Sequence, residues 1–367
     1  MHKLIAAASS VSRRMLLLLV ACLLLLILYI ICISDHPASW TQSSSTQVTR
    51  KQVNHSAEGC ITREMLASYR NYDDVSQFDT CRRIFYNRVP KCASRTILST
   101  MRALAVQHSF KIVSSPRGSH YSLNTPREIM NFTKEFHSIE EPFLYSKHLY
   151  FFNFTDYGMP QPVYINVIRD PLERAVSHYY YSKYGSHSKP VQNNATLNET
   201  GQMRECVDEK SCRGFFHVIL PFFCGHKRSC SKYHPPEDRW LLVAWAKQVI
   251  RQRYLVVGLT EDISGFMEVL ESFMPSYFKN ATNVFNDIGG RMKAKYRTVK
   301  KAKLDTDLEE KLKKRLAADY DLYGFVKQRF YNQLKRVRTW KERRTFHHMF
   351  KDVINGAPIK KLTSFVV

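Results

Sequence analysis

Residues 84–96 read I-F-Y-N-R-V-P-K-C-A-S-R-T, and they indicate a strand, a short loop and the start of a helix. Its first part is rich in β-branched and aromatic side chains, which predicts a strand over Ile84–Val89. Apolar residues at helical spacing predict a helix over residues 95–107. A strand that leads through a short loop into a helix brings free backbone N–H groups and the positive end of the helix dipole to one place, which suits an anion.

The side chains of this loop strengthen the interpretation as a phosphate site. Lys91 adds a mobile positive charge, and Ser94 and Thr96 add hydroxyl donors at the helix start. The stretch lacks the G-x-x-x-x-G-K pattern of a Walker A loop and contains no glycine. The pattern alone therefore leaves an alternative open, which is a capped helix that begins with a solvated lysine.

A second strand–loop–helix follows further along the chain. Val163–Ile168 predicts a buried strand, and Asp170 and Pro171 are the N-cap and first residue of a helix that ends near Gly185. Arg169 stands at the end of this strand.

Arg169 and Ser177, two helical turns later, are suited to hold a second phosphate. A nucleotide with phosphates at its 3′ and 5′ ends needs two such sites on neighbouring strands. The alternative interpretation is that Arg169 pairs with a carboxylate at the helix start.

The rest of the pattern favours an α/β fold with a parallel sheet flanked by helices, because β-rich runs alternate with helical ones. A third strand is expected at Tyr254–Val257, and one long helix is expected over about residues 307–337. We expect the folded domain to cover residues 82–340 and a basic tail to cover residues 341–367.

The N-terminal region predicts a membrane anchor. Residues 15–33 are uninterrupted apolar residues, close to the ~20 needed to span a bilayer as a helix. Basic residues precede this run, so the positive-inside rule makes residues 1–14 a cytosolic tail and the body lumenal. Residues 34–81, rich in Ser, Thr, Gln and Asn, are expected to form a stem. The alternative is a cleaved signal peptide, although the apolar run exceeds the usual h-region.

Cysteines and glycosylation signals agree with a lumenal body. Cys206 and Cys212, and likewise Cys224 and Cys230, lie six positions apart, which suits local disulfides in an oxidising compartment. A Cys60–Cys81 pair is a third expectation, and Cys92 is expected to be free. Metal binding is the alternative, but the chain has no C-x₂-C spacing, so we expect no metal. Six N-x-[S/T] sequons follow the anchor, at Asn54, Asn131, Asn153, Asn194, Asn198 and Asn280.

The formal net charge of +23 implies an anionic partner, and charge alone leaves nucleic acid, anionic lipid and an acidic polymer open. A lumenal basic protein does not meet nucleic acid, so an acidic polysaccharide is the natural partner.

Three longer motifs resemble the uronyl and heparan sulfate 2-O-sulfotransferases of the Golgi. They are N-R-V-P-K-C-A-S-R-T at residues 87–96, Q-P-V-Y-I-N-V-I-R-D-P at residues 161–171, and L-P-F-F-C-G-H-x-x-x-C at residues 220–230, within a resemblance that covers about residues 82–335. The resemblance implies a sulfotransferase fold and a single-pass type II Golgi membrane protein. It also implies transfer of a sulfuryl group from 3′-phosphoadenosine 5′-phosphosulfate (PAPS) to the 2-hydroxyl of iduronate or glucuronate.

Within this family the chain resembles the uronyl branch more closely, which acts on dermatan and chondroitin sulfate. The K-C-A-S-R-T stretch is uronyl-like, whereas Pro90 is the choice of the heparan branch. Heparan sulfate is therefore the alternative substrate. Resemblance to the heparan branch also allows a homotrimer.

The same resemblance assigns residue roles. We expect His148 to be the sole general base and Lys91 to neutralise the leaving phosphate; the alternative is a structural role for His148. The heparan branch has a second histidine where this chain has Ser146. Arg88 and Lys183 match basic contacts to the sugar chain. The basic segment 291–303 is interpreted as a lid over the 3′-phosphate, with a solvated mobile loop as the alternative. The expected donor-binding residues are Lys91, Cys92, Ala93, Ser94, Arg95, Thr96, Arg169, Ser177, Arg297 and Lys300.

Two rival functions remain open at this stage. A lumenal P-loop kinase would require a Walker-type loop and acidic Mg²⁺ ligands, which the sequence lacks. A non-catalytic glycosaminoglycan-binding membrane protein would explain the charge but not the two phosphate loops and His148.

Overall fold

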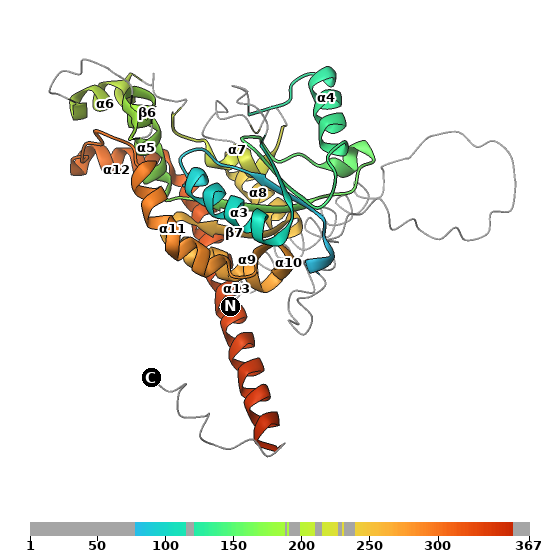
Figure 1. Ribbon diagram of the computed structural model, residues 1–367. Helices are drawn as coiled ribbons and strands as arrows, with labels where there is room; N and C mark the ends of the chain where they lie inside the picture. The colour runs from blue at the N-terminus through green and yellow to red at the C-terminus, as the bar shows by residue number, and fades with distance from the viewer. Residues whose placement is uncertain are drawn as a thin grey trace, which may run out of the picture. The chain divides into compact units, whose positions relative to one another are not determined.

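The computed structural model describes residues 78–114, 121–187, 189–190, 199–209, 215–226, 230 and 239–354, which belong to one compact unit (Figure 1). The expected cytosolic tail, the anchor at residues 15–33 and nearly all of the stem lie outside these ranges. Within them, none of the helices is both long enough and apolar enough to cross a bilayer.

The centre of the fold is a five-stranded sheet in which every strand is parallel to its neighbours. The strand order is β2-β3-β1-β4-β7. The strands are β1 (Arg83–Asn87), β2 (Lys111–Ser114), β3 (Phe143–Lys147), β4 (Val163–Ile168) and β7 (Tyr254–Leu259). A two-stranded antiparallel ribbon, β5 (Gly185–Ser186) with β6 (Lys189–Pro190), stands apart.

The strand order creates a switch point at β1, which lies between β3 on one side and β4 on the other. In parallel α/β sheets, ligands bind outside the carboxyl ends of the strands at such a point. The two predicted phosphate loops follow β1 and β4, and His148 follows β3. The topology therefore brings all three segments to one edge.

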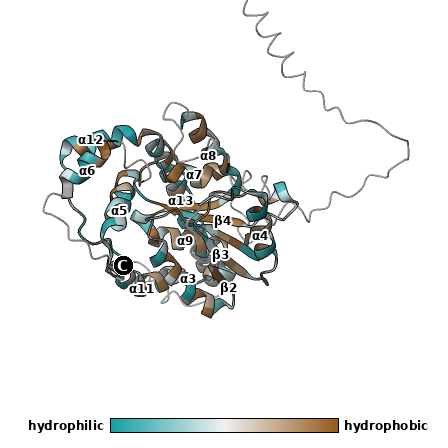
Figure 2. Ribbon diagram, turned by 90° about the horizontal axis from the view of Figure 1, so that it is seen from above, coloured by the Kyte–Doolittle hydropathy of each residue, from teal (hydrophilic) through white to brown (hydrophobic). Residues whose placement is uncertain are grey.

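Helices cover both faces of the sheet, as Figure 2 shows. On one face, α11 packs on α3 and α9, and α10 also packs on α3 and α9; on the other face, α8 packs on α7 and α13. The bounds of these helices are α3 (Ser94–His108), α7 (Ile219–Cys224), α8 (Arg239–Arg253), α9 (Ile263–Phe273), α10 (Pro275–Phe278), α11 (Ala281–Lys295) and α13 (Ala317–Ile354).

Helix α4 (Pro126–His137) packs by its aromatic side chains at the β3 side of the sheet. The ring of Phe132 contacts that of Tyr145, and the ring of Phe136 contacts those of Phe85 and Phe154. A capping box between Thr125 and Glu128 begins the helix.

A second, smaller core lies beside the main one. Helix α5 (Pro171–Tyr184) packs there with α6 (Glu199–Asp208) and α12 (Thr306–Arg315). Leu172, Met203 and Leu312 are members of this cluster. It supports the helix that carries the second phosphate loop.

The prediction of one long helix over residues 307–337 is wrong, because two helices meet at Leu316. Leu316 is 1% exposed and belongs to the second core, whereas Leu322, further along, belongs to the main core. A single straight helix could not bury both sets of apolar residues. Helix α13 then continues to Ile354, past the expected boundary at residue 340, and Figure 1 shows it running out of the body.

A buried amide ties the centre of the sheet together. Asn87, at the end of β1, is fully buried, and its Nδ2 donates to the carbonyls of Leu149 (3.3 Å) and Phe222 (3.0 Å). Its Oδ1 accepts from Asn166 Nδ2 (2.9 Å) and from the hydroxyl of Tyr254 (3.1 Å). Both donors and both acceptor positions of this side chain are therefore used. The amide joins β1 to β4, to β7, to the segment after β3 and to α7.

We expect Asn87→Ala to lower the free energy of unfolding by about 3 kcal/mol or more, because buried partners left without a hydrogen bond cost ~1–3 kcal/mol each. Tyr254→Phe removes one of the four hydrogen bonds and should cost about 1 kcal/mol. Urea unfolding of both variants measures the difference. Equal losses in the two variants would contradict the central role of Asn87.

Candidate active site

The loop after β1 folds tightly although it contains no glycine. Lys91 (φ 67°) and Ala93 (φ 54°) both adopt the left-handed conformation, which non-glycine residues rarely do. Alternation of left- and right-handed residues turns successive backbone N–H groups toward one concavity that suits an anion. Ala93 is also the N-cap of α3 and makes no side-chain capping bond. The first helical N–H groups therefore stay available to a ligand.

The loop's cations gather around one ring that the sequence analysis missed. Lys91 Nζ lies 3.5 Å from the centroid of Tyr181 on α5, and Arg95 donates to the Tyr181 hydroxyl at 2.8 Å. Tyr181 thus joins the first loop to the helix of the second. Burial, together with the charges of Arg95 and Arg169, lowers the pKa of Lys91 to about 7.

Several of the side chains in this loop that were expected to bind the donor are buried. Cys92 is free, as predicted, and fully buried, and burial raises the pKa of its thiol to about 12. It can contribute only its backbone to a bound anion. Ser94 and Thr96 are also buried, at 8% and 3% exposure.

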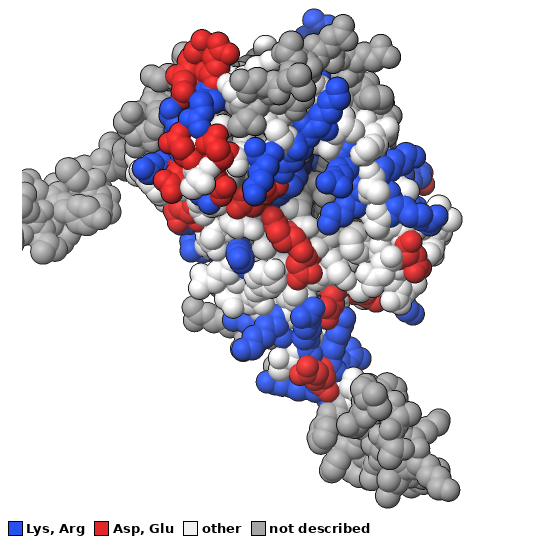
Figure 3. All heavy atoms as spheres, turned by 90° about the vertical axis from the view of Figure 1, so that its left-hand side faces the viewer, with Lys and Arg blue, Asp and Glu red and all other residues white. Residues whose placement is uncertain are grey.

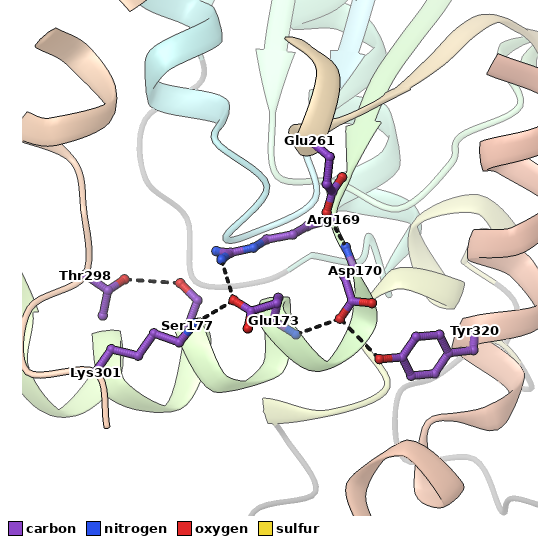
Figure 4. Close-up of polar contacts among 8 residues, drawn as sticks. All are labelled: Arg169, Asp170, Glu173, Ser177, Glu261, Thr298, Lys301 and Tyr320. Carbon is purple, nitrogen blue, oxygen red and sulfur yellow. Dashed lines mark hydrogen bonds and ion pairs between the residues drawn. The ribbon is translucent and has the colours of Figure 1, made fainter. Parts of the chain in front are cut away.

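The second loop follows β4, and its helix start forms as expected (Figure 4). Asp170 caps α5 by accepting from Glu173 N at 3.0 Å, and Pro171 is the first helical residue. The Asp170 carboxylate also accepts from the hydroxyl of Tyr320 (3.2 Å), while Asp170 N donates to Glu261 (3.0 Å). The start of α5 is therefore fixed to α13 and to the segment after β7.

Arg169 makes the carboxylate pair that had been the alternative interpretation. Its guanidinium lies 2.8 Å from Glu173, which also accepts from Lys301 at 2.5 Å. One turn further on, the hydroxyl of Ser177 is 3.1 Å from that of Thr298. The pairing does not remove Arg169 from the site, because Figure 4 shows these contacts side by side along α5.

The basic segment 291–303 is only partly a loop. Residues 291–295 form the last turns of α11, so the loop interpretation is wrong for them. From Arg297 onward the segment lies along the end of α5: the Arg297 carbonyl accepts from His187 N (3.3 Å), and Thr298 bridges to Ser186. Lys300 Nζ lies 5.3 Å from the ring of Tyr184. Arg297 is thereby held next to Thr298, whose hydroxyl contacts Ser177, and Lys300 is held beside Tyr184.

Several groups of Lys and Arg side chains lie on this side of the molecule, among Asp and Glu side chains. Figure 3 looks onto the side where α5, α11 and α12 lie, and Lys and Arg atoms gather there in several groups. The exposed members from the basic segment are Arg291, Lys293, Lys295, Arg297, Lys300, Lys301 and Lys303.

His148 is held above the start of the first loop. Its Nδ1 lies 2.7 Å from the carbonyl oxygen of Arg88. A carbonyl can only accept, so Nδ1 carries the proton and the lone pair is on Nε2. Burial, followed by the charge of Arg88 and then that of Arg95, lowers the pKa of His148 to about 4. The imidazole is therefore neutral at physiological pH.

The neighbours of His148 include a buried hydroxyl, an aromatic ring and a guanidinium group. Ser146, at the position of the heparan branch's second histidine, is fully buried in β3, and its hydroxyl has no hydrogen-bond partner among the residues that the structure describes. The ring of Tyr121 lies 6.2 Å from that of His148. On the other side, Arg88 is half-buried, and burial is the main cause that lowers its pKa.

Lys183, the second expected sugar contact, lies near the end of α5. Its Nζ donates to Gln202 of α6 and lies 5.4 Å from the ring of Tyr184. The structure thus places Lys183 beside the basic segment.

Cys224 and Cys230 form the predicted disulfide. Cys206 and Cys81 are disulfide-bonded as well, and their expected partners, Cys212 and Cys60, lie outside the described residues. Asn131 and Asn280 are exposed and Asn153 is partly exposed. The remaining sequons, Asn54, Asn194 and Asn198, lie outside the described residues. In the described part of the chain, no group of three or more His, Cys, Asp or Glu residues is suited to hold a metal ion.

Several side chains of the site were not found from the sequence: Tyr181, Glu173, Arg174, Thr298 and Lys301. Glu173 and Arg174 stand within the R-D-P-x-x-R motif and could have been examined by their helical spacing from Arg169. Arg174 is 1% exposed and donates to the Phe215 carbonyl. Lys301 belongs to the basic segment 291–303, which the sequence marked as a whole without singling out this lysine. Thr298 reaches the site through tertiary packing, and no local signal marks it.

Comparison with known proteins identifies the family of this chain. The profile of the sulfotransferase family matches residues 76–326. The chain is 34% identical over 262 residues to uronyl 2-sulfotransferase of Homo sapiens. The matched stretch covers 68% of this chain and 62% of that protein. It is 33% identical over 291 residues to the uronyl 2-sulfotransferase of Mus musculus, with 76% and 66% covered.

Heparan sulfate 2-O-sulfotransferase 1 of Homo sapiens is 31% identical over 235 residues, with 62% of each chain covered. In each of these comparisons the matched part is slightly less than two thirds of the relative's own length.

The structure predicts how His148 titrates. Because its folded pKa of about 4 lies below the ordinary 6.5, His148 should stay neutral, with the proton on Nδ1, until the pH falls close to 4. Between these pH values the unfolded chain binds more protons, so stability should fall as the pH falls. Histidine ¹⁵N NMR, with His148→Gln to assign the signal, measures the pKa. A value above about 6 would contradict the burial argument.

Proposed function

Because the chain belongs to the sulfotransferase family, we propose that it transfers a sulfuryl group from PAPS to the 2-hydroxyl of iduronate or glucuronate in dermatan or chondroitin sulfate. One observation carries the proposal: the ring of His148 is hydrogen-bonded to Arg88, three residues before Lys91 in the first phosphate loop. A neutral base and a cation are thereby fixed in one unit at the carboxyl edge of the sheet. The names of the relatives support a uronic acid as the acceptor.

The residues of the two loops fit a donor with phosphates at both ends. The left-handed backbone at Lys91 and Ala93, the free start of α3 and the Lys91 ammonium suit the 5′-phosphosulfate. Arg169 and Ser177 suit the 3′-phosphate, with Arg297 and Lys300 beside them. PAPS supplies the sulfuryl group, and its bisphosphate is the leaving group.

His148 and Lys91 divide the chemistry between them. As the sugar oxygen bonds to sulfur, Nε2 of His148 takes the hydroxyl proton, and the Nδ1–H bond to Arg88 keeps the ring oriented. The bridging S–O bond breaks toward the phosphate, where the Lys91 ammonium stabilises the developing negative charge. An anion near His148 and Lys91 favours the protonated form of each and so raises both pKa values.

The surroundings of the chain's body fit the same proposal. We propose a single-pass type II protein of the Golgi membrane, on the basis of the apolar run 15–33, the sequons and the Cys224–Cys230 disulfide. Arg88 and Lys183 are proposed contacts to the acidic chain. The net charge of +23 supports an acidic glycosaminoglycan as the partner.

The test is transfer of ³⁵S from labelled PAPS to a panel of desulfated polymers. We expect label on the 2-position of uronic acid, more in dermatan and chondroitin than in heparan chains. Preference for heparan chains would assign the chain to the heparan branch. Label on hexosamine only, or none, would refute the proposal.

In the same assay, His148→Ala should lower kcat by roughly 10²–10⁴-fold, the usual contribution of a general base. Binding of adenosine 3′,5′-bisphosphate should stay nearly unchanged, because the base acts in the transition state. Ser146→His, which restores the second histidine of the heparan branch, serves as a control. The wild type should be active without this substitution. Substantial turnover by His148→Ala would require another base.

Lys91 should make binding of adenosine 3′,5′-bisphosphate depend on pH. Its pKa of about 7 means that part of the population is neutral at pH 8, so an anion must bind with proton uptake and affinity should fall as the pH rises. Calorimetry in buffers of different ionisation enthalpy counts the protons. Lys91→Arg should bind without proton uptake, and Lys91→Ala should bind about ten- to a hundredfold more weakly. Equal uptake by wild type and Lys91→Arg would show that another group titrates.

A further inference from the structure

Glu173 lies between the two side chains assigned to the 3′-phosphate. Arg169, Glu173 and Ser177 are spaced by four residues, so they share one face of α5 and its entry, as Figure 4 shows. A phosphate dianion held by Arg169 and Ser177 would therefore stand next to the Glu173 carboxylate. Two negative groups at this separation repel each other.

Two cations of the site, Arg169 and Lys301, are bound to this carboxylate in the structure. The Arg169 guanidinium lies 2.8 Å from Glu173, and Lys301 lies 2.5 Å from the same oxygen, Oε2. The side chain of Glu173 is 48% exposed, so it has room to turn toward solvent. Partial burial acts against the charged form, but hydrogen bonding and charge from Lys301, with the charge of Arg169, lower the pKa of Glu173.

The basic segment does not depend on Glu173 for its position. Thr298 contacts Ser177 and bridges to Ser186, and the Arg297 carbonyl accepts from His187 N. The N-cap bond of α5 uses only the backbone N–H of Glu173. Neutralising the carboxylate should leave both the segment and the helix start in place.

We propose that Glu173 competes with the nucleotide's 3′-phosphate for Arg169 and Lys301. A bound 3′-phosphate takes over these cations, and the carboxylate turns outward. The competition weakens binding of every ligand that carries a 3′-phosphate, including the bisphosphate product, and so speeds its release. Glu173 acts on phosphate affinity and takes no part in the chemical step. This inference rests on the proposed function, because it uses the assignment of Arg169 and Ser177 to the 3′-phosphate.

The experiment compares two probes, adenosine 3′,5′-bisphosphate and adenosine 5′-phosphate, which lacks the 3′-phosphate. We expect Glu173→Gln to bind the bisphosphate about three- to tenfold more tightly, with a slower dissociation rate, because one exposed charged competitor has been removed. Affinity for adenosine 5′-phosphate should not change. Titration calorimetry gives the affinities, and stopped-flow displacement gives the rates.

Two further variants sharpen the test. Glu309→Gln removes another exposed glutamate, which pairs with Lys313 in the same i,i+4 arrangement on α12, and it should leave both affinities unchanged. Lys301→Met should weaken binding of the bisphosphate and leave binding of adenosine 5′-phosphate unchanged. Thermal unfolding of each variant confirms that it is folded.

Each outcome decides the question. Unchanged or weaker bisphosphate binding by Glu173→Gln, with wild type binding normally, overturns the role of Glu173 and leaves the proposed function standing. If Glu173→Gln binds both probes more tightly by the same factor, the effect is one of general electrostatics, and the proposed competition is also overturned. If the wild type binds no bisphosphate, the proposed function and this inference fail together.

Discussion

The site depends on one buried side chain, Asn87, and on the four hydrogen bonds that its amide makes. A buried amide without partners is costly, so the segments that satisfy it cannot move independently. The amide fixes the end of β1 to β4 and β7, and it also holds Leu149 and Phe222. The first phosphate loop begins at the next residue, and His148 precedes Leu149. His148 and the loop after β1 therefore share one rigid support.

On this support the site concentrates positive charge that is only partly neutralised. Lys91, Arg95, Arg169 and Arg174 act on one another, and Lys91 sits over the Tyr181 ring. Mutual repulsion among cations makes each charged form less favourable, and an incoming dianion relieves it. The same field, with burial, keeps His148 neutral and ready to accept a proton. Glu173 of α5 partly neutralises this charge, because its carboxylate pairs with Arg169 and Lys301.

Local signals predicted much of the scaffold. The strand at β4, the cap at Asp170 and the helix end at Gly185 follow from residues adjacent in sequence, so they were correct. The strand β3 was not predicted, and the late helix was predicted without its break at Leu316. Both depend on distant partners: β3 becomes a strand by pairing with β1 and β2, and Leu316 turns into the second core beside α5 and α6.

The α/β class, the two strand–loop–helix segments, the free Cys92 and the Cys224–Cys230 pair follow from the sequence, because each depends on short-range pattern or spacing. The arrangement around them depends on contacts between residues that are distant in sequence. Strand order puts His148 beside the start of the loop after β1, packing brings Tyr181 under Lys91, and the basic segment carries Thr298 and Lys301 to α5. The left-handed backbone at Lys91 and Ala93 also depends on the tertiary structure. No residue preference predicts it, and it persists because the buried surroundings of the loop hold it.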